Sequence, residues 1–592
     1  MKPRRSESPP ARRPGWSSIA GAPRALGVAL VRAVDRNRAL GLSAAIVALV
    51  HAVNMTGFPY YENDEGTYLS QAWSVLHLGR LAPYTYWYDH PPLGWIQIGP
   101  LVELFRVVSP TYLGAGRFVM FLLAVASAVL VYLSTIRLTR SRVAALVATL
   151  VFGLSPFAVM FHRRVLLDNI ATFWVLVALV IALRTDKTLT STWASAAAMA
   201  AAVLSKEVVV FFFPAVLYAA LLGVDRRRRR MFLSNWLGMF AIVGSLYPLY
   251  ALLKGEFFPA GSVFGGRTPH VSLLGTLAFQ AGRTGGCGDA INGVLDCVWQ
   301  QDPLLMVAAA VGLGVALFEV WEDAHARLMA LLVVPFLTFL LRGGLVLDWY
   351  FVPLIPMVAI ALAWAGCEVL GAAGRALRRS LLARESWGAF PDRLRRHDLP
   401  ALPGRLMLSL RHRMAARLLV GRRLRHASLS IVLPLVVVVV GVGPAFEAVA
   451  AASSRAAAHL AAAYSGSYRS LLSEGATRSQ LQALGWIREN LSAGSTIVVD
   501  NYLWADLASD GVAHEAHYYW KVEKDPEIRM GVLSDDWRSV DYVVVTETLA
   551  SDVRTDEFPF LRAVLQHGRP IVSFRGGGSF VEIVEIVDDM DG

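Results

Sequence analysis

The sequence predicts a polytopic α-helical membrane protein with about eleven transmembrane helices, followed by a C-terminal soluble α/β domain. Three observations predict this fold class. The 592 residues are 55% hydrophobic and only 17% charged, which is less charge than a soluble protein of this length carries. Many apolar runs reach the roughly 20 residues that a helix needs to cross a bilayer. Residues 451–592 differ, because short β-branched runs alternate there with polar turns.

The distribution of basic residues predicts the orientation in the membrane. Arginine and lysine are frequent in residues 1–38 and recur between the apolar runs, as the positive-inside rule expects of cytoplasmic segments. The net charge of +11 is explained in this way and does not indicate a nucleic-acid partner. The run 39–55 is interpreted as a retained helix, because no small-residue cleavage pattern follows it closely. The Ala-, Arg- and Gly-rich composition favours a bacterial plasma membrane.

The membrane spans follow one another along the chain. The first, 39–57, leads to an outer loop at 58–111, in which Leu93–Val108 has an apolar face suited to the membrane surface. Run 192–222 is too long for one crossing, so two spans are expected to meet at an outer turn at 205–207. Arg226 to Arg230 then lie inside. The remaining expected spans are 112–135, 143–160, 165–183, 231–253, 303–320, 328–341, 349–369 and 429–450.

These spans divide the chain into regions. A transmembrane domain at 39–369 carries the outer loops 58–111 and 254–302, and an Arg-rich cytoplasmic linker at 370–428 leads to the last span. Cys287 and Cys297 lie close together in the second outer loop and could form a disulfide there. Residues 451–592 form the extracytoplasmic domain. A helix is expected there at 479–491 and buried strands at 495–500, 541–545, 570–574 and 580–584.

Adjacent acids follow the first span directly, in Tyr61-Glu62-Asn63-Asp64-Glu65. Ionised groups beside a membrane are costly and usually functional. A carboxylate here, Asp64 or Glu65, could remove a proton from a hydroxyl group as a general base. The alternative is a solvated loop in which Asn63 or Asp64 caps the next helix. Tyr61 and the tyrosines and tryptophan at 84–88 are explained by an interfacial aromatic belt, although stacking on a sugar is a second use.

Cationic side chains gather on the same predicted outer face. Arg163 and Arg164 lie where two spans meet, and guanidinium groups match phosphate oxygens. Asp168 lies one turn after Arg164, so an i, i+4 ion pair is the simpler interpretation. Lys206, beside Glu207, interrupts an apolar run and could attract an anionic head group, or could mark only a hairpin tip.

Two further groups belong to this face. His90 precedes Pro91 and Pro92, which favour a helix start, and its ring could donate a hydrogen bond to phosphate or could simply pack. Tyr350 lies with Arg342 and Asp348 in a comparable cluster. Asp64, Glu65 and His90 could together bind a divalent metal ion, although no cofactor is certain.

Several motifs, taken in order, resemble the GT-C membrane glycosyltransferases, in particular bacterial lipid A aminoarabinose transferases and protein O-mannosyltransferases. The resemblance covers about residues 39–365. Its motifs are Asn63-Asp64-Glu65-Gly66-Thr67-Tyr68, Ala72-Trp73, Gly79, His90-Pro91-Pro92-Leu93, Arg164 to Asn169, Leu204-Ser205-Lys206 and Trp349 to Pro356.

The resemblance implies a polyprenyl-phosphate-linked sugar as donor and an acceptor glycan, lipid or protein that is glycosylated at the outer face of the bilayer. Asp64 matches the catalytic acid position, with Glu65 beside it, and Lys206 with Arg164 would hold the donor phosphate. The aminoarabinose transferases have lysine where this chain has His90. Histidine need not be charged at neutral pH, so the departure weakens a phosphate-binding role there.

Two other classes of protein fit parts of the sequence. A transporter or a flippase of lipid-linked sugars would also be polytopic, but would usually show inverted repeats and broken helices at matching positions, and neither is clear here. A membrane-anchored scaffold or sensor would not need so many spans, or an acidic pair in the first loop. Direct displacement at the sugar, with inversion, is the mechanism that the motifs favour.

Overall fold

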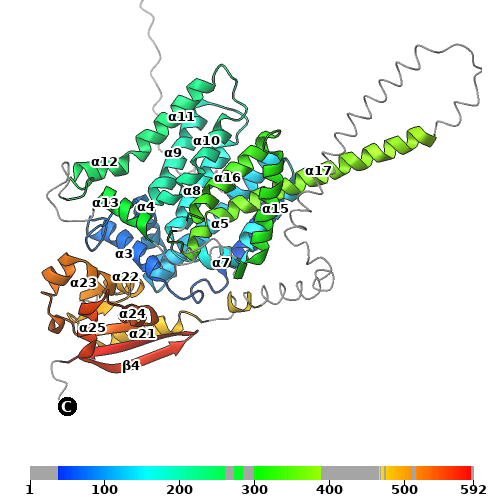
Figure 1. Ribbon diagram of the computed structural model, residues 1–592. Helices are drawn as coiled ribbons and strands as arrows, with labels where there is room; N and C mark the ends of the chain where they lie inside the picture. Colours follow the sequence, from blue (N-terminus) through cyan, green and yellow to red (C-terminus); the bar gives the residue numbers. More distant parts are fainter. Residues whose placement is uncertain are drawn as a thin grey trace, which may run out of the picture.

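The chain forms a helical bundle and a smaller sheet-containing domain that lies against one end of the bundle (Figure 1). The computed structural model describes residues 38–260, 272–283, 296, 299–300, 302–342, 344–388, 466, 468–471, 475–509 and 515–587. Cys287, Cys297, the expected span 429–450 and most of the linker 370–428 lie outside the described residues.

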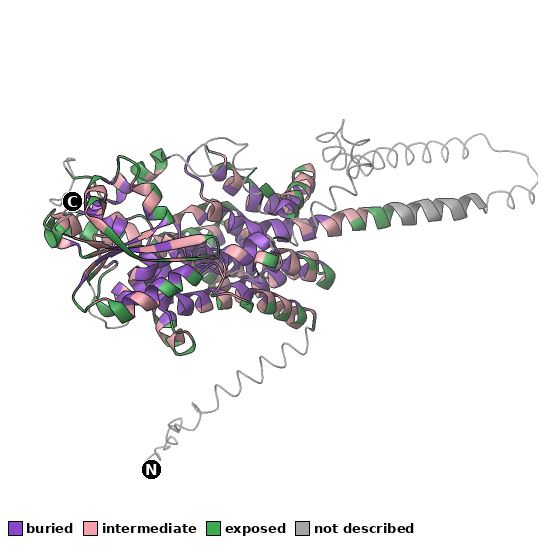
Figure 2. Cartoon of the chain, turned by 90° about the horizontal axis from the view of Figure 1, so that it is seen from below, coloured by how far each residue is buried: buried purple, intermediate pink, exposed green. Residues whose placement is uncertain are grey.

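The bundle follows the apolar runs of the sequence. Its first helices are α2 (Arg38–Ala52), α3 (Asn63–His77), α4 (Leu93–Phe105), α5 (Tyr112–Thr139), α6 (Arg142–Gly153), α7 (Pro156–Phe161), α8 (Leu167–Ala182) and α9 (Leu189–Ser205). It continues with η3 (Glu207–Phe212), α10 (Phe213–Leu221), α11 (Arg229–Gly244), α12 (Leu246–Leu253), α13 (Leu273–Gly282), α15 (Pro303–Glu319), α16 (Ala324–Leu340), η4 (Asp348–Phe351) and α17 (Leu354–Gly388). Buried residues concentrate in the middle of the bundle (Figure 2).

Three helical stretches among the described residues are long and apolar enough to cross a membrane, at Tyr112–Thr139, Arg229–Leu253 and Asp348–Arg375. Shorter apolar helices occupy the other described spans. Run 192–222 is divided as expected: α9 ends at Ser205, and the extended backbone of Lys206 (φ −155°, ψ 119°) separates it from η3.

Two boundaries differ from the sequence prediction. The expected span 143–160 is two helices, α6 and α7, because Ser155 caps a new helix whose first residue is Pro156. Proline disfavours helical backbone in the residue before it, so the first helix ends there. Helix α17 continues to Gly388, well past the expected end at residue 369, and extends beyond the rest of the bundle (Figure 1).

The C-terminal part contains a five-stranded sheet with the order β2-β1-β3-β5-β4. Its strands are β1 (Thr496–Val499), β2 (Glu515–Tyr518), β3 (Tyr542–Thr546), β4 (Gly568–Gly576) and β5 (Ser579–Ile586). Strand β1 is parallel to β2 and β3, whereas β5 is antiparallel to β3 and β4. The helices are α21 (Arg478–Asn490), α22 (Asn501–Ser509), α23 (Tyr519–Lys524), α24 (Glu547–Asp552) and α25 (Pro559–Gln566). Four strands lie where the sequence predicts them, and the short, polar β2 was missed.

The two faces of the sheet belong to different cores. Side chains alternate along a strand, so Ile497 and Val499 lie on one face and Val498 on the other. The first face packs with α21 and α22 in a single hydrophobic core that continues into the bundle. The second face packs with α23 and α25 in a separate core. The domain is therefore joined to the bundle by apolar contact as well as by the chain.

Close backbone approach at Gly66 brings the domain against α3. A Cβ atom at this position would lie 2.0 Å from the backbone nitrogen of Tyr502 and 2.1 Å from the carbonyl carbon of Asn501. Hydrogen bonds flank the contact: the backbone nitrogen of Asn501 donates to Asn63 Oδ1 (3.1 Å), and Asn501 Nδ2 donates to Thr67 Oγ1 (2.8 Å). Glycine is required here because a side chain would push α22 away from α3.

Replacing Gly66 with alanine should separate α22 from α3. Overpacking of this kind costs about 1–3 kcal/mol, so we expect a lower Tm of the full chain in detergent and faster amide exchange in α22. Gly238→Ala in α11 is the control, because a methyl group added there would have no atom within 4 Å. A Gly66→Ala protein with the Tm and exchange rates of the control would contradict the close contact.

Candidate active site

Four distant parts of the chain bring charged side chains together at the end of the bundle near the sheet domain. Asp64 lies in the first turn of α3, His90 lies in the segment before α4, Lys206 separates α9 from η3, and Asp168 lies in the first turn of α8. Tyr350 of η4 completes the group, since Lys206 Nζ lies 5.5 Å from the centre of its ring.

Lys206 is the centre of this group. Its side chain is 1% exposed, and its ammonium lies 3.7 Å from Asp168 Oδ2 and 3.0 Å from His90 Nε2. Asp168 is completely buried, and neither of its oxygens accepts a hydrogen bond from a described residue. A buried charge needs a partner of opposite sign. Here Asp168 on α8 is the partner of Lys206 at the end of α9.

His90 is held from both sides. Its Nδ1 lies 3.0 Å from Glu207 Oε2, and its Nε2 lies 3.0 Å from Lys206 Nζ. An ammonium can only donate, so Nε2 accepts from Lys206 and the proton is on Nδ1, directed at Glu207. His90 in this tautomer is neutral, and both of its ring nitrogens have partners. It therefore orients Lys206 and is not free to donate to a phosphate.

Asp64 is half-buried and close to these charges. Burial raises the pKa of its carboxyl group above the usual value, while the positive charges of Lys206 and Arg283 act in the opposite direction. Asp64 is the second residue of α3, and Glu62 caps that helix. A carboxylate with a raised pKa, under the influence of a fixed cation, suits proton abstraction near neutral pH.

Glu65, the neighbouring acid, does not join the group. Its two oxygens accept hydrogen bonds from Nη2 (2.7 Å) and Nε (3.0 Å) of Arg117 on α5, and both side chains are 0% exposed. The backbone nitrogen of Val165 also donates to it (3.0 Å). Arg117 donates in turn to the carbonyl oxygens of Met55, Pro59 and Tyr60. In this geometry both Glu65 oxygens are occupied by Arg117, and this contact favours a structural role over the catalytic role that the sequence suggested.

Arg163 and Tyr61 also lie apart from Lys206. Arg163 donates to the carbonyl oxygens of Val50 (2.9 Å) and Val53 (2.7 Å) at the end of α2, so its guanidinium group is occupied by backbone. Tyr61 is buried with its ring 4.6 Å from the Arg117 guanidinium. Arg163 thus binds the end of α2 and Tyr61 contacts Arg117, so the partners of both residues lie outside the charged group.

Arg164 occupies an intermediate position. Its Nη1 lies 3.9 Å from Glu62 Oε2, two residues before Asp64, and its guanidinium stacks 4.9 Å from the ring centre of Tyr60. It does not pair with Asp168 as an i, i+4 partner, because Asp168 is turned to Lys206. Burial raises the pKa of Glu62 to about 7, and the Arg164 charge opposes this rise. Arg164 is thus adjacent to the Asp64 segment.

Two cavities are lined by residues that neighbour the charged group in the sequence, although the residues of that group do not line them. An apolar groove of about 210 Å³ lies between α15, α16 and α17, and Phe351 of η4 is one of the residues that line it. A wider cleft of about 720 Å³ lies between residues 79–86, α12 and the sheet domain. Tyr84, Tyr86, Tyr250, Lys254 and Glu527 are among the residues that line it. The first cavity suits hydrocarbon, and the second suits a polar molecule with ring faces.

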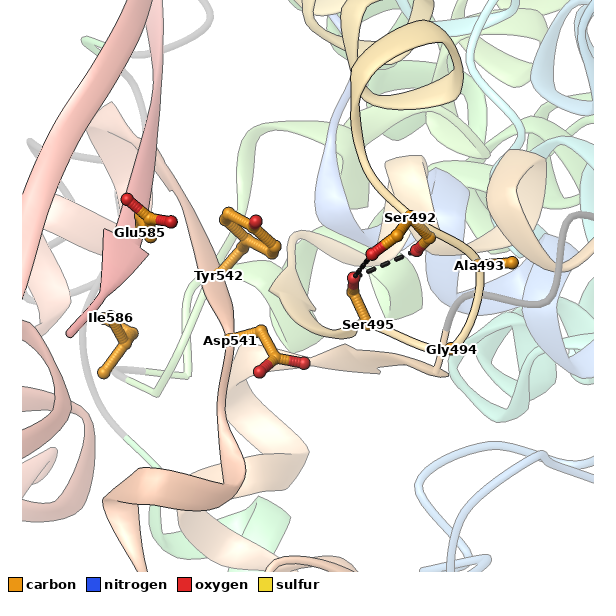
Figure 3. Close-up of a pocket in the computed structure, with 8 residues that line it drawn as sticks. All are labelled: Ser492, Ala493, Gly494, Ser495, Asp541, Tyr542, Glu585 and Ile586. Carbon is orange, nitrogen blue, oxygen red and sulfur yellow. Dashed lines mark hydrogen bonds between the residues drawn. The ribbon is translucent and has the colours of Figure 1, made fainter. Parts of the chain in front are cut away.

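A third pocket, of about 340 Å³, lies wholly within the sheet domain (Figure 3). Figure 3 shows Ser492 and Ser495 directed at each other, and their hydroxyl groups are 3.0 Å apart. Asp541 accepts a hydrogen bond from the backbone nitrogen of Thr496 (2.8 Å). These polar groups stabilise their own turns, and the residues that line the pocket include no base paired with a nucleophile.

Of the three residues that the sequence suggests as metal ligands, Glu65 directs its carboxylate to Arg117. Within the described ranges, no group of three histidine, cysteine or acidic side chains is placed to hold a metal ion.

Sequence reasoning missed two partners, the buried Arg117 and the half-buried Glu62. A signal for Arg117 was present, because it is the only charge within a long apolar run, 112–135, and an intramembrane arginine implies an acidic partner. Nothing in the local sequence links Glu62 to Arg164. Their contact depends on how α3 and the turn before α8 meet.

Comparison with known proteins gives the family context. The model for dolichyl-phosphate-mannose-protein mannosyltransferases matches residues 89–252, a segment that holds His90, Asp168 and Lys206. No curated protein matches the chain.

Solved structures extend the likeness to nearly the whole chain. ArnT from Cupriavidus metallidurans bound to undecaprenyl phosphate is 16% identical, covers 93% of this chain and 98% of its own, and has a TM-score of 0.54. Its apo state is 15% identical, with 92% and 97% covered and a TM-score of 0.52. The oligosaccharyltransferase AglB from Archaeoglobus fulgidus reaches a TM-score of only 0.46, at 13% identity, with 93% and 74% covered. The resemblance to GT-C membrane glycosyltransferases is confirmed, and the fold is theirs.

Breaking the Glu65–Arg117 pair should destabilise the protein strongly. Glu65→Gln or Arg117→Met leaves a buried charge without its partner, which typically costs about 3–5 kcal/mol. We expect a large fall in Tm for each variant and a smaller loss for the double variant than the sum of the two. Asp186→Asn, in an exposed pair with Arg184, should leave Tm nearly unchanged. A stable Glu65→Gln protein that has lost only activity would instead make Glu65 a catalytic residue.

Proposed function

We propose that this protein is an integral membrane glycosyltransferase that moves a sugar from a polyprenyl-phosphate donor to an acceptor hydroxyl group on the extracytoplasmic face, with inversion. One observation carries the proposal: a half-buried carboxylate, Asp64, lies within the electrostatic reach of a buried ammonium, Lys206, which Asp168 and His90 hold in place. Displacement of a phosphate from a sugar needs these two groups, a base and a fixed cation.

Asp64 acts as the base in this proposal. The acceptor oxygen attacks the anomeric carbon from the face opposite the phosphate, and its proton passes to a carboxylate oxygen of Asp64. The bond between the anomeric carbon and the phosphate oxygen breaks, and the phosphate keeps the electron pair. A single displacement inverts the anomeric configuration. General-base assistance of this kind contributes about 10²–10⁴-fold.

Lys206 stabilises the departing lipid phosphate, and its environment prepares it to do so. Asp168 and His90 fix the ammonium before substrate binds, so little reorganisation is needed as negative charge develops. Because His90 is neutral in this tautomer, it does not offset the positive charge of Lys206. Arg164, close to the Asp64 segment, is the second cation that could contact the donor phosphate.

The two cavities suggest where the substrates lie. The apolar groove at Phe351 would take the polyprenyl chain, because its lining residues are apolar and Phe351 directly follows Tyr350, whose ring contacts Lys206. The cleft between residues 79–86 and α12 would admit the acceptor. Tyrosine rings there suit sugar faces, and its volume lies in the usual range for ligand sites.

Replacing Asp64 with asparagine should abolish proton removal while keeping the shape of the site. We expect transfer to fall by about 10²–10⁴-fold, with an unchanged Tm. The assay is consumption of labelled polyprenyl-phosphate sugars by membranes that contain the full chain, followed by mass analysis of the envelope glycans. The exposed Asp225→Asn is the matched control. Unreduced transfer in Asp64→Asn would remove Asp64 from the base role, and movement of intact donor across vesicles without consumption would favour a flippase.

Replacing Lys206 with methionine should affect both the donor and the pH profile. Loss of the ammonium should raise the donor KM and lower kcat by about 10²–10³-fold. Asp64 must be ionised to act, so activity falls as pH drops through its raised pKa. Lys206 lowers that pKa, and its removal should shift the acid limb of kcat/KM to higher pH. Donor kinetics and an acid limb like those of the unmodified protein would exclude the phosphate-binding role.

A further inference from the structure

The segment Tyr84–His90 is held in a strained shape by contacts from outside itself. It joins α3 to α4 without helix or strand, and Tyr88 adopts φ +60°, which a bulky residue rarely does unless its surroundings hold it there. Thr276 Oγ1 donates to the Trp87 carbonyl oxygen (2.6 Å), and Tyr88 donates to Glu256 (2.6 Å). The other side of the segment faces the sheet domain.

Asp525 of the sheet domain binds this segment directly. Its carboxylate is completely buried, and its two oxygens accept hydrogen bonds from the backbone nitrogen (3.0 Å) and Oγ1 (2.9 Å) of Thr85. Hydrogen bonds to a charged acceptor are stronger than neutral ones. Two of them on one residue fix both the position and the direction of the backbone at Thr85.

Lys521 lies one turn earlier, on α23, and makes the second contact. Its ammonium lies 3.5 Å from the ring centre of Trp87 and 4.5 Å from that of Tyr84, which are cation–π distances. Trp520, the preceding residue, meets Trp87 edge to face at 5.2 Å. The side chain of Lys521 is 5% exposed, so the sheet domain places a desolvated cation between rings of the bundle segment.

The held segment leads directly to the charged group. Tyr86 donates to the carbonyl oxygen of His90 (2.5 Å), and the His90 ring bonds to Lys206 and Glu207. A shift at Thr85 or Trp87 is therefore transmitted over three to five residues to the partner of Lys206. Gly66 brings the same domain against the first turns of α3, which carry Asp64.

We infer that Lys521 and Asp525 of the C-terminal domain are positioning residues, which hold residues 84–90 so that His90 is presented to Lys206. The inference rests on the proposed function for its effect on transfer. Its structural part, the clamping of the segment by the domain, can be measured without any substrate.

The experiment uses the full chain in detergent and two matched pairs of variants. Thr85→Val removes the hydroxyl donor to Asp525, whereas Thr85→Ser keeps it. Lys521→Met removes the caged ammonium, whereas Lys524→Met removes an ammonium three residues later that contacts Glu557 and Phe558 of the same domain. Amide exchange of peptides covering residues 84–92 is measured without substrate, together with Tm, kcat, donor KM and the acid limb of the pH profile.

We expect Thr85→Val and Lys521→Met to exchange faster at residues 84–92 with little change in Tm. Their kcat should fall by roughly 10- to 100-fold, as small misplacements of a site can cause. The acid limb should also shift, because His90 holds Lys206 and the Lys206 charge lowers the pKa of Asp64. Thr85→Ser and Lys524→Met should behave like the unmodified protein. Unchanged exchange in both test variants overturns the inference whatever the activity. If the test variants exchange faster at residues 84–92 but the unmodified protein transfers no sugar, the proposed function is overturned. The positioning of this segment by Lys521 and Asp525 is then still supported.

Discussion

The cost of burying charge is the constraint on which the arrangement at this end of the bundle depends. A desolvated ion is tolerated only beside a partner of opposite sign, and here the partners are supplied by different elements. Glu65 and Arg117 join α3 to α5, and Lys206 with Asp168 joins the end of α9 to α8. Each pair therefore fixes the relative position of two helices. The position of Asp64 relative to Lys206 follows from these pairs, because Asp64 precedes Glu65 directly on α3.

Much of the fold could be predicted from the sequence, since hydrophobic runs and β-branched strands are local signals. The break at Lys206 and four of the five strands follow from such signals. The gathering of Asp64, His90, Asp168, Lys206 and Tyr350 was expected from topology and resemblance together. The different environments of Asp64 and Glu65 could not be predicted, because Glu65 is paired with Arg117, which lies 52 residues from it in the sequence. The same holds for Tyr61 and Arg163, whose partners are defined only by the tertiary structure.

The docking of the C-terminal domain was beyond sequence reasoning for a similar reason. Its contacts pair residues more than 400 positions apart, such as Thr85 with Asp525 and Tyr61 with Gln480. The side chains concerned are ordinary polar residues with no distinguishing pattern. The GT-C fold accounts for the bundle as a framework, whereas the chemistry proposed here depends on individual side chains that the fold alone does not specify.

One hydrophobic core runs from the bundle into one face of the sheet. This continuity limits how the two parts of the protein can change independently. A domain that shares its hydrophobic core with the helical bundle cannot be exchanged without disturbing that core. Each substitution on α3 that alters the close contact at Gly66 requires a compensating change on α22. The helical bundle and the C-terminal domain therefore constrain each other's sequence, and grafting the C-terminal domain of a relative onto this bundle would require matching residues on both α3 and α22.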